Sequence, residues 1–476
     1  MEKEKFLIKN ELVSSDETVN IINPYSSEIV KQVYKSNSEH INISLDYLTE
    51  TFAKFRKTPA YLKASLLAVI SNKIKQRKEE LAYLMTLETG KPIKLSRIEV
   101  DRAVFTFETG SEEARRIDGD VIQIDQLKGA EGKFGIIKRF PLGPIFAITP
   151  WNFPINLVAH KISPALASGN VVLLKPASSS LCCGLEIGKI IKEASEEVGL
   201  EYCPVNVITS SGNEVDKFVS DKRVKMVSFT GSPLVGWNLK KKLSMQKISL
   251  ELGGNAGVIV DETANLKLAA SKIALGAFAH AGQSCISVQR VFVHKNIYRE
   301  FEKLLIGEAK KIKFGNPFED DTLVGPMINE AEAKRVEQWI EEAEETGGKI
   351  LSGGKRNNAM LEPTIISNAK KEINVNAKEV FAPLMTLNEF DNFKQAVKEV
   401  DDSEFGLQAG VFTNNMQNAF YAYDNIEVGG VVINDVSTYR MDSMPYGGMK
   451  QSGVGREGIK YAIEEMTERK ILVIGN

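Results

Sequence analysis

The chain has 476 residues, 43% of them hydrophobic and 26% charged, which is the composition of a globular protein long enough for two or three domains. Its 60 basic and 62 acidic residues nearly balance, so it lacks both the basic surplus of a nucleic-acid-binding protein and an acidic tail. Its apolar runs are of strand length, and none reaches the roughly 20 residues of a membrane helix, so no membrane partner is expected.

The N-terminus and the cysteines indicate the compartment. Residues 1–5 are mostly charged and lead into no apolar segment, so we expect no signal peptide. Four cysteines are too few for a disulfide scaffold, and no Cys-x-x-Cys pair suggests a zinc site. Cys182 and Cys183 are expected to pack in a helix, and Cys203 in the core at the start of a strand. These features predict a reduced, cytoplasmic protein without a metal site.

The first part of the chain carries helical signals. Apolar residues recur at four-residue intervals over residues 62–74, which predicts an amphipathic helix. Gly90 and Pro92 end the next helical stretch, because neither residue continues a helix well.

Between about residues 134 and 260, short apolar runs alternate with helical patterns such as residues 183–198. Continuous apolar strands separated by helices predict a parallel sheet covered on both faces, as in a doubly wound nucleotide-binding domain. The predicted strands are residues 145–149, 171–174, 205–209, 226–229 and 257–260.

A second α/β part follows residue 260. It contains an amphipathic helix at residues 330–346 and an apolar run at residues 429–434. The last ten residues, 467–476, include the apolar run 471–474. A terminal strand of this kind would be an exposed edge, so we expect it to pair with another subunit.

Three segments carry residues suited to catalysis. Cys285 follows Gly282 and Gln283 among small polar residues, which suits a thiol that a substrate reaches; a cysteine packed as a small hydrophobe fits the same stretch. Prolines flank Asn152 and would aim its amide at a reacting carbonyl, unless the segment is only a turn. Glu251 has apolar neighbours, and burial would make it a base near neutral pH; a capping or salt-bridging role is the alternative.

These segments and several others resemble motifs of the aldehyde dehydrogenase superfamily, in the family's order and approximate spacing. The motifs are TPWNFP at 149–154, KPA at 175–177, FTGS at 229–232, LELGG at 250–254, GQSC at 282–285, EVFAP at 379–383 and PYGGMKQSG at 445–453. Each is weak alone, but together they extend the resemblance over nearly the whole chain.

The resemblance implies an α/β fold with a Rossmann-like cofactor domain, an α/β catalytic domain and a small β oligomerisation arm. The expected boundaries are residues 1–121 and 142–251 for the NAD(P)-binding domain, 252–448 for the catalytic domain, and 122–141 with 449–476 for the arm. It also implies a homodimer or homotetramer.

The same resemblance implies the catalytic roles. Cys285 would be the nucleophile, and the Asn152 side chain with the Cys285 N–H would bind the oxyanion of the thiohemiacetal. Hydride would leave for the nicotinamide, giving a thioester, and Glu251 would activate the water that hydrolyses it. One nucleophile, one donor set and one base are what this chemistry needs.

NADP or NAD is the implied cofactor. Lys175 would bind the adenosine ribose, Gly231 and Ser232 the pyrophosphate, and Glu379 the nicotinamide ribose. The other residues expected at the cofactor are Thr149, Pro150, Trp151, Ser178 and Phe381. Where the family often has Glu, this chain has Ser178, which removes repulsion toward a 2′-phosphate and leads us to expect that NADP is accepted.

A G-x-G-x-x-G sequence at residues 453–458 matches the dinucleotide fingerprint. It follows no predicted strand and lies near the C-terminus, so the context that the fingerprint requires is missing. We interpret it as a structural loop near the subunit arm.

For the substrate, Arg440 lies in the segment that corresponds to the family's substrate vestibule. An arginine there would recognise a carboxylate or phosphate, and a structural ion pair is the alternative. The amino-acid sequence around this segment resembles those of lactaldehyde, non-phosphorylating glyceraldehyde-3-phosphate, phosphonoacetaldehyde and succinate-semialdehyde dehydrogenases. A small hydroxylated or anionic aldehyde is therefore the expected substrate.

Other classes of function remain open. A CoA-acylating dehydrogenase would not need Glu251, and a non-catalytic relative would not need all of Asn152, Glu251 and Cys285. A hydrolase that uses Cys285 would need a histidine, and none has triad spacing; His280 is interpreted as structural.

Overall fold

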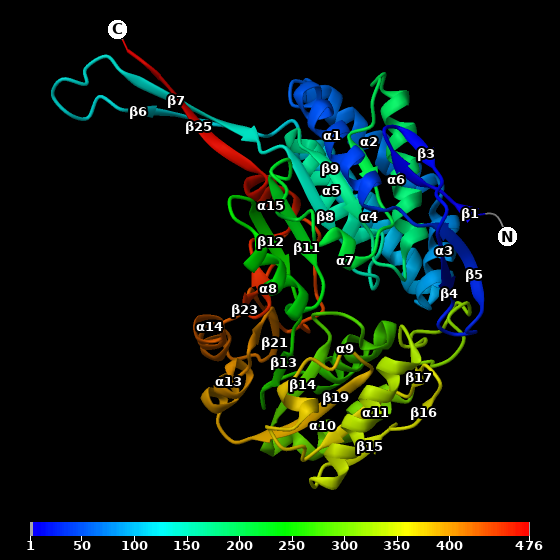
Figure 1. The fold of residues 1–476 in the computed structure, drawn as a ribbon. Coiled ribbons are helices and arrows are strands. Elements are labelled where there is room, and N and C mark those ends of the chain that lie inside the picture. The colour runs from blue at the N-terminus through cyan, green and yellow to red at the C-terminus, as the bar shows by residue number, and fades with distance from the viewer. Residues whose placement is uncertain (1–2, 476) are drawn as a thin grey trace.

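Two largely parallel sheets organise the chain, one in each half of the molecule, and a third, narrow sheet projects from the first half (Figure 1). The computed structural model describes residues 3–475. Mixed α/β architecture with parallel sheets is confirmed.

The first sheet has eight strands, of which the central five are parallel. In spatial order they are β24 (Gly453–Val454), β12 (Lys247–Glu251), β11 (Met226–Thr230), β8 (Pro144–Ile148), β9 (Val171–Lys175), β10 (Val205–Val207), β2 (Phe6–Ile8) and β3 (Glu11–Val13). Every residue of β8 and β9 is buried, because helices cover both faces of a parallel sheet. Their continuous apolar sequences follow from that burial.

Helices α1 and α5 pack on β8 and β9, and α6 packs on β10. All thirteen residues of α5 are buried, so this helix lies inside the first half and not on its surface. The helices of this half are α1 (Ser38–Phe55), α2 (Ala60–Gln76), α3 (Lys78–Thr89), α4 (Ile93–Glu113), α5 (Asn156–Ser168), α6 (Leu181–Glu197), α7 (Gly212–Val215), α8 (Pro233–Lys242) and α15 (Ile459–Glu465). The helix expected at residues 62–74 is α2, and Gly90 ends α3 in the left-handed conformation, as predicted.

The second sheet has seven strands: β15 (Lys349–Ser352), β18 (Thr364–Ser367), β19 (Leu384–Phe390), β14 (Val288–His294), β13 (Ala256–Val260), β21 (Gln408–Phe412) and β22 (Gly430–Ile433). All neighbouring pairs are parallel except β15 with β18. Its helices are α9 (Leu266–Phe278), α10 (Tyr298–Ala309), α11 (Glu330–Glu345), α12 (Asn374–Ala377), α13 (Phe393–Asp401) and α14 (Met416–Asn425).

For one predicted strand, two expectations differ. The apolar pattern groups residues 257–260 with the strands of the first sheet, whereas the boundaries implied by the resemblance place them in the catalytic domain; they form β13, which pairs with β14 and β21 in the second sheet. The chain crosses from one half to the other directly after β12. A buried apolar strand has the same sequence pattern in either sheet, so the pattern alone does not reveal the crossing.

The projecting sheet consists of β25 (Thr467–Ile474), β7 (Phe134–Pro141) and β6 (Asp120–Gln123), and β25 pairs with β7 along its whole length (Figure 1). It carries exposed apolar side chains, among them Val121 at 75% and Leu472 at 58% exposure. The segment before β25 lies on the body, since β24 pairs with β12 and α15 packs on α5.

Smaller elements complete the fold. They are a three-stranded sheet of β1 (Lys3–Glu4), β5 (Ile29–Tyr34) and β4 (Thr18–Ile22), and two strand pairs, β16 (Arg356–Asn357) with β17 (Met360–Leu361) and β20 (Phe405–Gly406) with β23 (Met449–Lys450). None of the helices within residues 3–475 has the length and apolar character of a membrane span.

Candidate active site

Four parallel strands of the first sheet end at one edge, and the predicted site residues lie at or after these ends. β12 ends at Glu251, opposite Thr230 at the end of β11. β8 and β9 end opposite one another at Ile148 and Lys175. Because ligands of open α/β sheets bind beyond the carboxyl ends of the strands, this edge is the expected site.

Cys285 lies on a strained turn between α9 and β14. It follows three consecutive residues with positive φ, namely His280 at 55°, Ala281 at 53° and Gly282 at 63°. Non-glycine residues in this region cost free energy, so the surrounding packing must hold the turn. A Cβ at Gly282 would lie 2.1 Å from the carbonyl oxygen of Ala382, so only glycine fits.

The two glycines after Glu251 allow the two halves to approach closely. A Cβ at Gly254 would lie 2.1 Å from the carbonyl oxygen of Cys285, and one at Gly253 would lie 2.4 Å from the Glu379 carboxylate. The Gly254 N–H also donates to Glu379 Oε1 at 2.8 Å. The LELGG segment therefore packs the predicted base, nucleophile and ribose-binding residue against one another.

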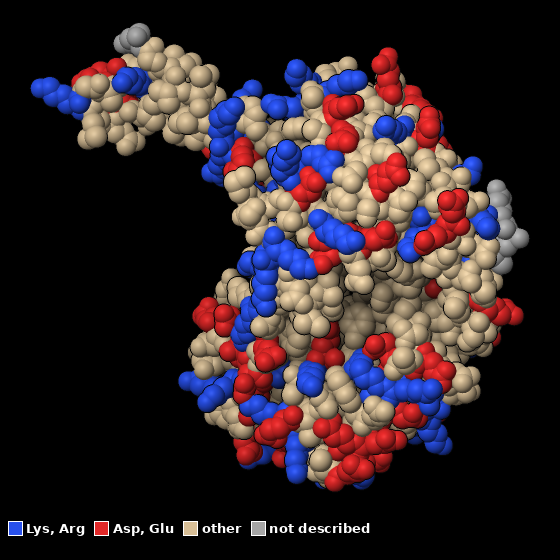
Figure 2. All heavy atoms as spheres, viewed as in Figure 1, with Lys and Arg blue, Asp and Glu red and all other residues tan. Residues whose placement is uncertain are grey.

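One cavity of about 750 Å³ lies at this junction, and the molecular surface is hollowed between the two halves (Figure 2). Of the predicted site residues, its lining includes Pro150, Trp151, Asn152, Ser178, Gly231, Ser232, Glu251, Cys285, Glu379, Phe381 and Arg440. Thr149 and Lys175 lie beside it, linked by a hydrogen bond from the Thr149 N–H to the Lys175 carbonyl at 3.1 Å. Eleven of the thirteen predicted residues thus share the lining of one cavity.

The sequence predicts that the Asn152 amide is aimed at a reacting carbonyl, but in the structure the amide also bonds to the protein. Its Nδ2 donates to the carbonyl of Gln283 at 3.0 Å, which ties the TPWNFP segment to the loop before Cys285. An amide nitrogen carries two hydrogens, so one donor remains beyond this bond.

A buried ion pair holds the segment that carries Asn152. Lys91 Nζ lies 2.5 Å from Glu99 and donates to the Asn152 carbonyl at 3.1 Å. The other Glu99 oxygen accepts the N–H groups of Ile155 and Asn156. Both charged side chains are 1% exposed. The sequence does not reveal this pair, because Lys91 stands between Gly90 and Pro92, where only the end of a helix is predicted.

The pKa values of two neighbouring carboxyl groups, Glu251 and Glu457, are shifted in opposite directions. Glu251 is buried, and neither of its oxygens has a hydrogen-bond partner among the described residues. Burial and the charge of Glu457 raise the pKa of Glu251 well above its usual value. Burial acts in the same direction on Glu457, but ion pairs with Lys161 at 3.3 Å and Arg440 at 2.9 Å lower its pKa to about 2.

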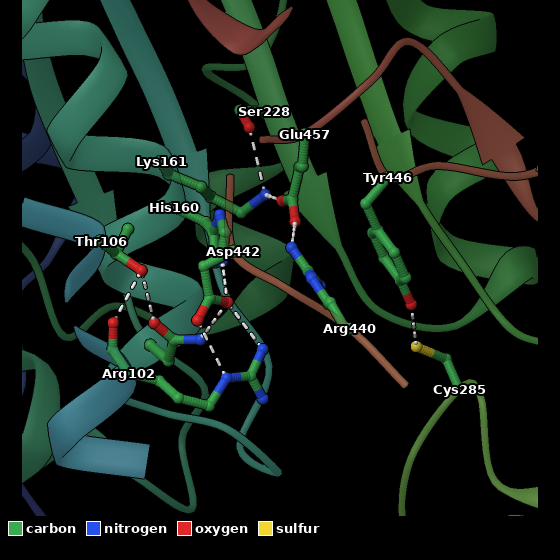
Figure 3. A network of polar contacts seen from close by, with 11 residues as sticks. Arg102, Thr106, His160, Lys161, Ser228, Cys285, Arg440, Asp442, Tyr446 and Glu457 are labelled. Carbon is green, nitrogen blue, oxygen red and sulfur yellow. Dashed lines mark hydrogen bonds and ion pairs between the residues drawn. The ribbon is translucent and has the colours of Figure 1, made fainter. Parts of the chain in front are cut away.

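Cys285 is half-buried, and its Sγ lies 3.1 Å from the hydroxyl of Tyr446 (Figure 3). Burial raises the pKa of the Cys285 thiol to about 12. The guanidinium carbon of Arg440 stacks 3.7 Å from the centre of the Tyr446 ring.

A second network lies next to Arg440 (Figure 3). Asp442 accepts two hydrogen bonds from Arg102, at 2.6 and 3.0 Å, and one each from Asn156 and His160. Burial alone would raise the pKa of Asp442, but the bonds to His160 and Arg102 hold it well below its usual range. Arg102 also lines the cavity, so two guanidinium groups flank it.

The G-x-G-x-x-G segment has a different position than predicted. Gly453 and Val454 form β24 at the edge of the first sheet, and Glu457 lines the cavity beside Glu251. The segment does lead through α15 to the projecting sheet, but its glycines also pack at the site, where a Cβ at Gly455 would lie 2.9 Å from Ser249 Oγ. The pairing of this loop with β12 joins distant parts of the chain, so no local sequence pattern indicates it.

Residues at one end of the cavity fit a dinucleotide. Gly231 and Ser232 line the cavity directly before α8, and the Ser232 side chain caps no N–H of that helix, so a phosphate group would find a helix N-terminus here. Glu379 provides a carboxylate whose pKa burial raises to about 7. The rings of Trp151 and Phe381 lie edge to face at 5.9 Å.

Several residues of the site had no signal in the sequence. Arg102 lies on α4 and His160 and Lys161 lie on α5, where their spacing is that of ordinary helix positions. Only the PYGGMKQSG motif marked the neighbourhood of Tyr446. An arginine or lysine on a buried helix face is the one pattern that could have suggested them.

Comparison with known proteins gives a consistent result. A sequence model described as the aldehyde dehydrogenase family matches residues 12–472. The chain is 41% identical over 472 residues to 3-sulfolactaldehyde dehydrogenase of Priestia aryabhattai, covering 98% of this chain and 97% of that protein.

Solved structures agree in fold along the entire chain. Aldehyde dehydrogenase 21 from Physcomitrella patens, in complex with the reaction product succinate, has a TM-score of 0.96 and 40% identity, covering 100% of this chain and 98% of that one. Glyceraldehyde-3-phosphate dehydrogenase GapN from Methanocaldococcus jannaschii, complexed with NADP, has a TM-score of 0.93 and 37% identity, covering 97% of this chain and 100% of that one.

Proposed function

The chain belongs to the aldehyde dehydrogenase family, and from this premise we propose that it oxidises a small hydroxylated or anionic aldehyde, with the anionic ones preferred, to the carboxylic acid, with NADP or NAD, through Cys285. The observation that carries this proposal is one cavity lined by Cys285, Asn152 and Glu251 together with two arginines. The arginines, Arg102 and Arg440, are the positively charged groups that would bind an anionic substrate.

In the proposed reaction, the Cys285 thiol first loses its proton to solvent, the thiolate Sγ attacks the aldehyde carbon, and the carbonyl oxygen becomes an oxyanion. The second hydrogen on Asn152 Nδ2 and the N–H of Cys285 are donors suited to this oxyanion. Bound at the Ser232 end of the cavity, the nicotinamide cofactor would accept the hydride that leaves the substrate carbon.

Glu251 has the position and environment of a general base. Its carboxylate takes the proton from the water that attacks the thioester, and the carbon–sulfur bond then breaks to release the acid. A carboxyl with a raised pKa is a stronger base once ionised, which suits it to this step.

The anionic group of the substrate would meet Arg440 and Arg102. Arg440 binds Glu457 through Nη2, and its Nε has no hydrogen-bond partner among the described residues, so donor capacity remains. The substrates in the names of two relatives, 3-sulfolactaldehyde and glyceraldehyde 3-phosphate, are small and anionic, whereas lactaldehyde, in the names of others, is a small neutral hydroxyaldehyde. Both interpretations of Arg440 made from the sequence, an ion pair and an anion site, are compatible with this geometry.

A CoA-acylating reaction is the second candidate. Against it stands Glu251, since transfer of the acyl group to a thiol does not need a buried base at the thioester. A non-catalytic protein would have no need of the strained turn that presents Cys285, because such strain costs stability.

The test is formation of NAD(P)H, followed by absorbance, with a panel of anionic and neutral aldehydes and each cofactor. We expect turnover with small anionic aldehydes and none in Cys285→Ala. Arg440→Met should lower kcat/KM for anionic aldehydes by about tenfold or more relative to neutral ones, because only the anionic substrates lose a charge-assisted hydrogen bond. Activity that appears only when CoA is added would favour the acylating reaction.

We also propose that the chain forms a homodimer or homotetramer through the projecting sheet, whose apolar side chains are exposed in the single chain. A cytoplasmic location, with all four cysteines free, completes the proposal. Cell fractionation tests the location, and light scattering tests the subunit number.

A further inference from the structure

We propose that the hydroxyl of Tyr446 is a hydrogen-bond donor that stabilises the thiolate of Cys285, and that Arg440 strengthens this donor through its contact with the tyrosine ring. This inference rests on the proposed function of Cys285 as the nucleophile. It adds a residue that touches the reacting sulfur and that the sequence analysis did not single out.

Backbone hydrogen bonds and side-chain packing hold Tyr446 in position. Its hydroxyl lies 3.1 Å from Cys285 Sγ, within the range of a hydrogen bond to sulfur. Its N–H donates to the Glu457 carbonyl at 3.1 Å, and its own carbonyl accepts the Glu457 N–H at 2.6 Å. The ring is buried with Ile286 and Leu407. The hydroxyl is therefore fixed by backbone and packing, and the bond to Cys285 does not depend on a mobile side chain (Figure 3).

The direction of the hydrogen bond follows from protonation. Burial and the nearby Cys285 raise the pKa of Tyr446 well above its usual value, so the phenol keeps its proton at physiological pH. Toward a thiolate, a protonated phenol can only donate. Such a bond stabilises the charged form of Cys285 against burial, which disfavours it.

Other charges also act on Cys285. Glu251 and Glu379 raise its pKa, whereas Arg440 lowers it together with Tyr446. Arg440 is held by Glu457, and its guanidinium lies over the Tyr446 ring at 3.7 Å. A cation against the ring withdraws electron density from the phenol and makes the hydroxyl a stronger donor. An anion that binds Arg440 would thus act on the same residue that holds the sulfur.

The test is the pH dependence of alkylation by iodoacetamide, in which the thiolate displaces iodide and forms a thioether. It uses the full chain and needs no turnover, so it succeeds or fails independently of the aldehyde reaction. Mass spectrometry of the Cys285 peptide assigns the product, because Cys182, Cys183 and Cys203 are buried. Tyr446→Phe keeps the ring and removes only the hydroxyl.

In Tyr446→Phe we expect the inflection of the alkylation profile to move to higher pH. At a pH below both inflections the rate constant should fall about tenfold or more, the effect of a lost hydrogen bond to a charged group. Tyr461→Phe is the matched control: Tyr461 is half-buried on α15 and is not among the cavity-lining residues within 3–475. Its profile should equal that of the wild type.

Arg440→Lys is a second variant, because lysine keeps the charge beside Glu457 without the planar contact to the ring. It should move the inflection in the same direction by a smaller amount. An unchanged or lowered inflection in Tyr446→Phe overturns the proposal; if that variant does not fold, an unchanged inflection in Arg440→Lys does so. A wild type that oxidises no aldehyde, with the expected alkylation shifts, contradicts the proposed function and leaves the role of Tyr446 standing.

Discussion

At the scale of single residues, the two oxygens of Glu251 are the most informative atoms of the site. A buried carboxyl without hydrogen bonds is costly, and it is retained only where surrounding structure holds it. Its environment pushes its pKa up while the pKa of neighbouring Glu457 is pushed down. A base and a permanent anion side by side are a division of roles that suits hydrolysis of a thioester.

Glu251→Gln should therefore separate the two halves of the reaction. Formation of the thioester, with one equivalent of NAD(P)H, should persist as a rapid burst, whereas steady-state kcat should fall by about 10²- to 10⁴-fold, the contribution typical of a general base. Because the wild-type base must lose a proton, its kcat should rise with pH, and this limb should be absent in the variant. Stopped-flow absorbance measures both phases. A variant with full steady-state turnover would contradict the assignment of Glu251.

The raised pKa of Glu379 predicts that the stability of the folded chain depends on pH. Its pKa is about 7 in the folded chain and about 4.3 when unfolded, so between these values the folded state holds more protons. The contribution of Glu379 to the free energy of unfolding thus falls as pH rises from about 4.3 to 7 and is constant above that range. Glu379→Gln should remove this part of the slope in urea unfolding. Equal slopes in both proteins would show that Glu379 does not titrate in this way.

Ser178 bears on the choice of cofactor. It is exposed at the cavity, where a carboxylate would repel the 2′-phosphate of NADP. Ser178→Glu should lower the ratio of kcat/KM for NADP to that for NAD by about tenfold, since unit charges near a protein surface interact by up to about 4 kcal/mol. Ser178→Ala, which adds no charge, should leave the ratio unchanged. A wild type that uses NAD alone would refute the expectation.

At the scale of secondary-structure elements, the start of α4 is joined to the segment that carries Asn152. The Lys91–Glu99 pair is the point of attachment, and its three backbone partners, on Asn152, Ile155 and Asn156, leave little freedom to the TPWNFP segment. Removing one member of a buried pair leaves the other charge without a partner, which is more harmful than losing the attraction itself.

Glu99→Gln should lower the free energy of unfolding by about 3 to 5 kcal/mol and lower kcat more than it raises KM, because Asn152 loses its support. Arg97 on the same helix pairs with Glu79 and Asp320 at the surface, so Arg97→Gln should cost about 1 kcal/mol or less. Urea unfolding and steady-state kinetics of the two variants give the comparison. Similar losses in both would mean that burial of the pair is of no consequence.

Helices and strands could be predicted from the sequence where one local pattern of apolar residues determines them. The strands at 145–149 and 171–174 and the helix at 62–74 follow from apolar runs and four-residue spacing, and their predicted positions agree with β8, β9 and α2. Which sheet β13 joins depends on a turn after Glu251 that no periodicity describes. The ion pairs of Lys161 with Glu457 and of Arg102 with Asp442 join positions far apart along the chain, so no local pattern could reveal them.

At the scale of the whole molecule, the projecting sheet predicts assembly. Ile471, Leu472, Val473 and Ile474 are between 39% and 58% exposed, an apolar strand that is unusual for the surface of a monomer. Leu472→Lys combined with Val473→Glu should lower the mass measured by light scattering toward the 52.6 kDa of one chain. Lys470→Glu, which changes a charged position of the same strand, is the control. A wild type already at the mass of one chain would refute assembly.

Because α5 is buried, opening of the first half of the molecule should also inactivate the enzyme. All thirteen of its residues are shielded from solvent, and His160 and Lys161 on it join the networks around Arg440. Its amide hydrogens can exchange with deuterium only when the first half opens, so they should be among the slowest to exchange. An opening large enough to expose them also takes apart the site. Deuterium uptake in α5 and irreversible loss of activity on heating should then proceed at one common rate.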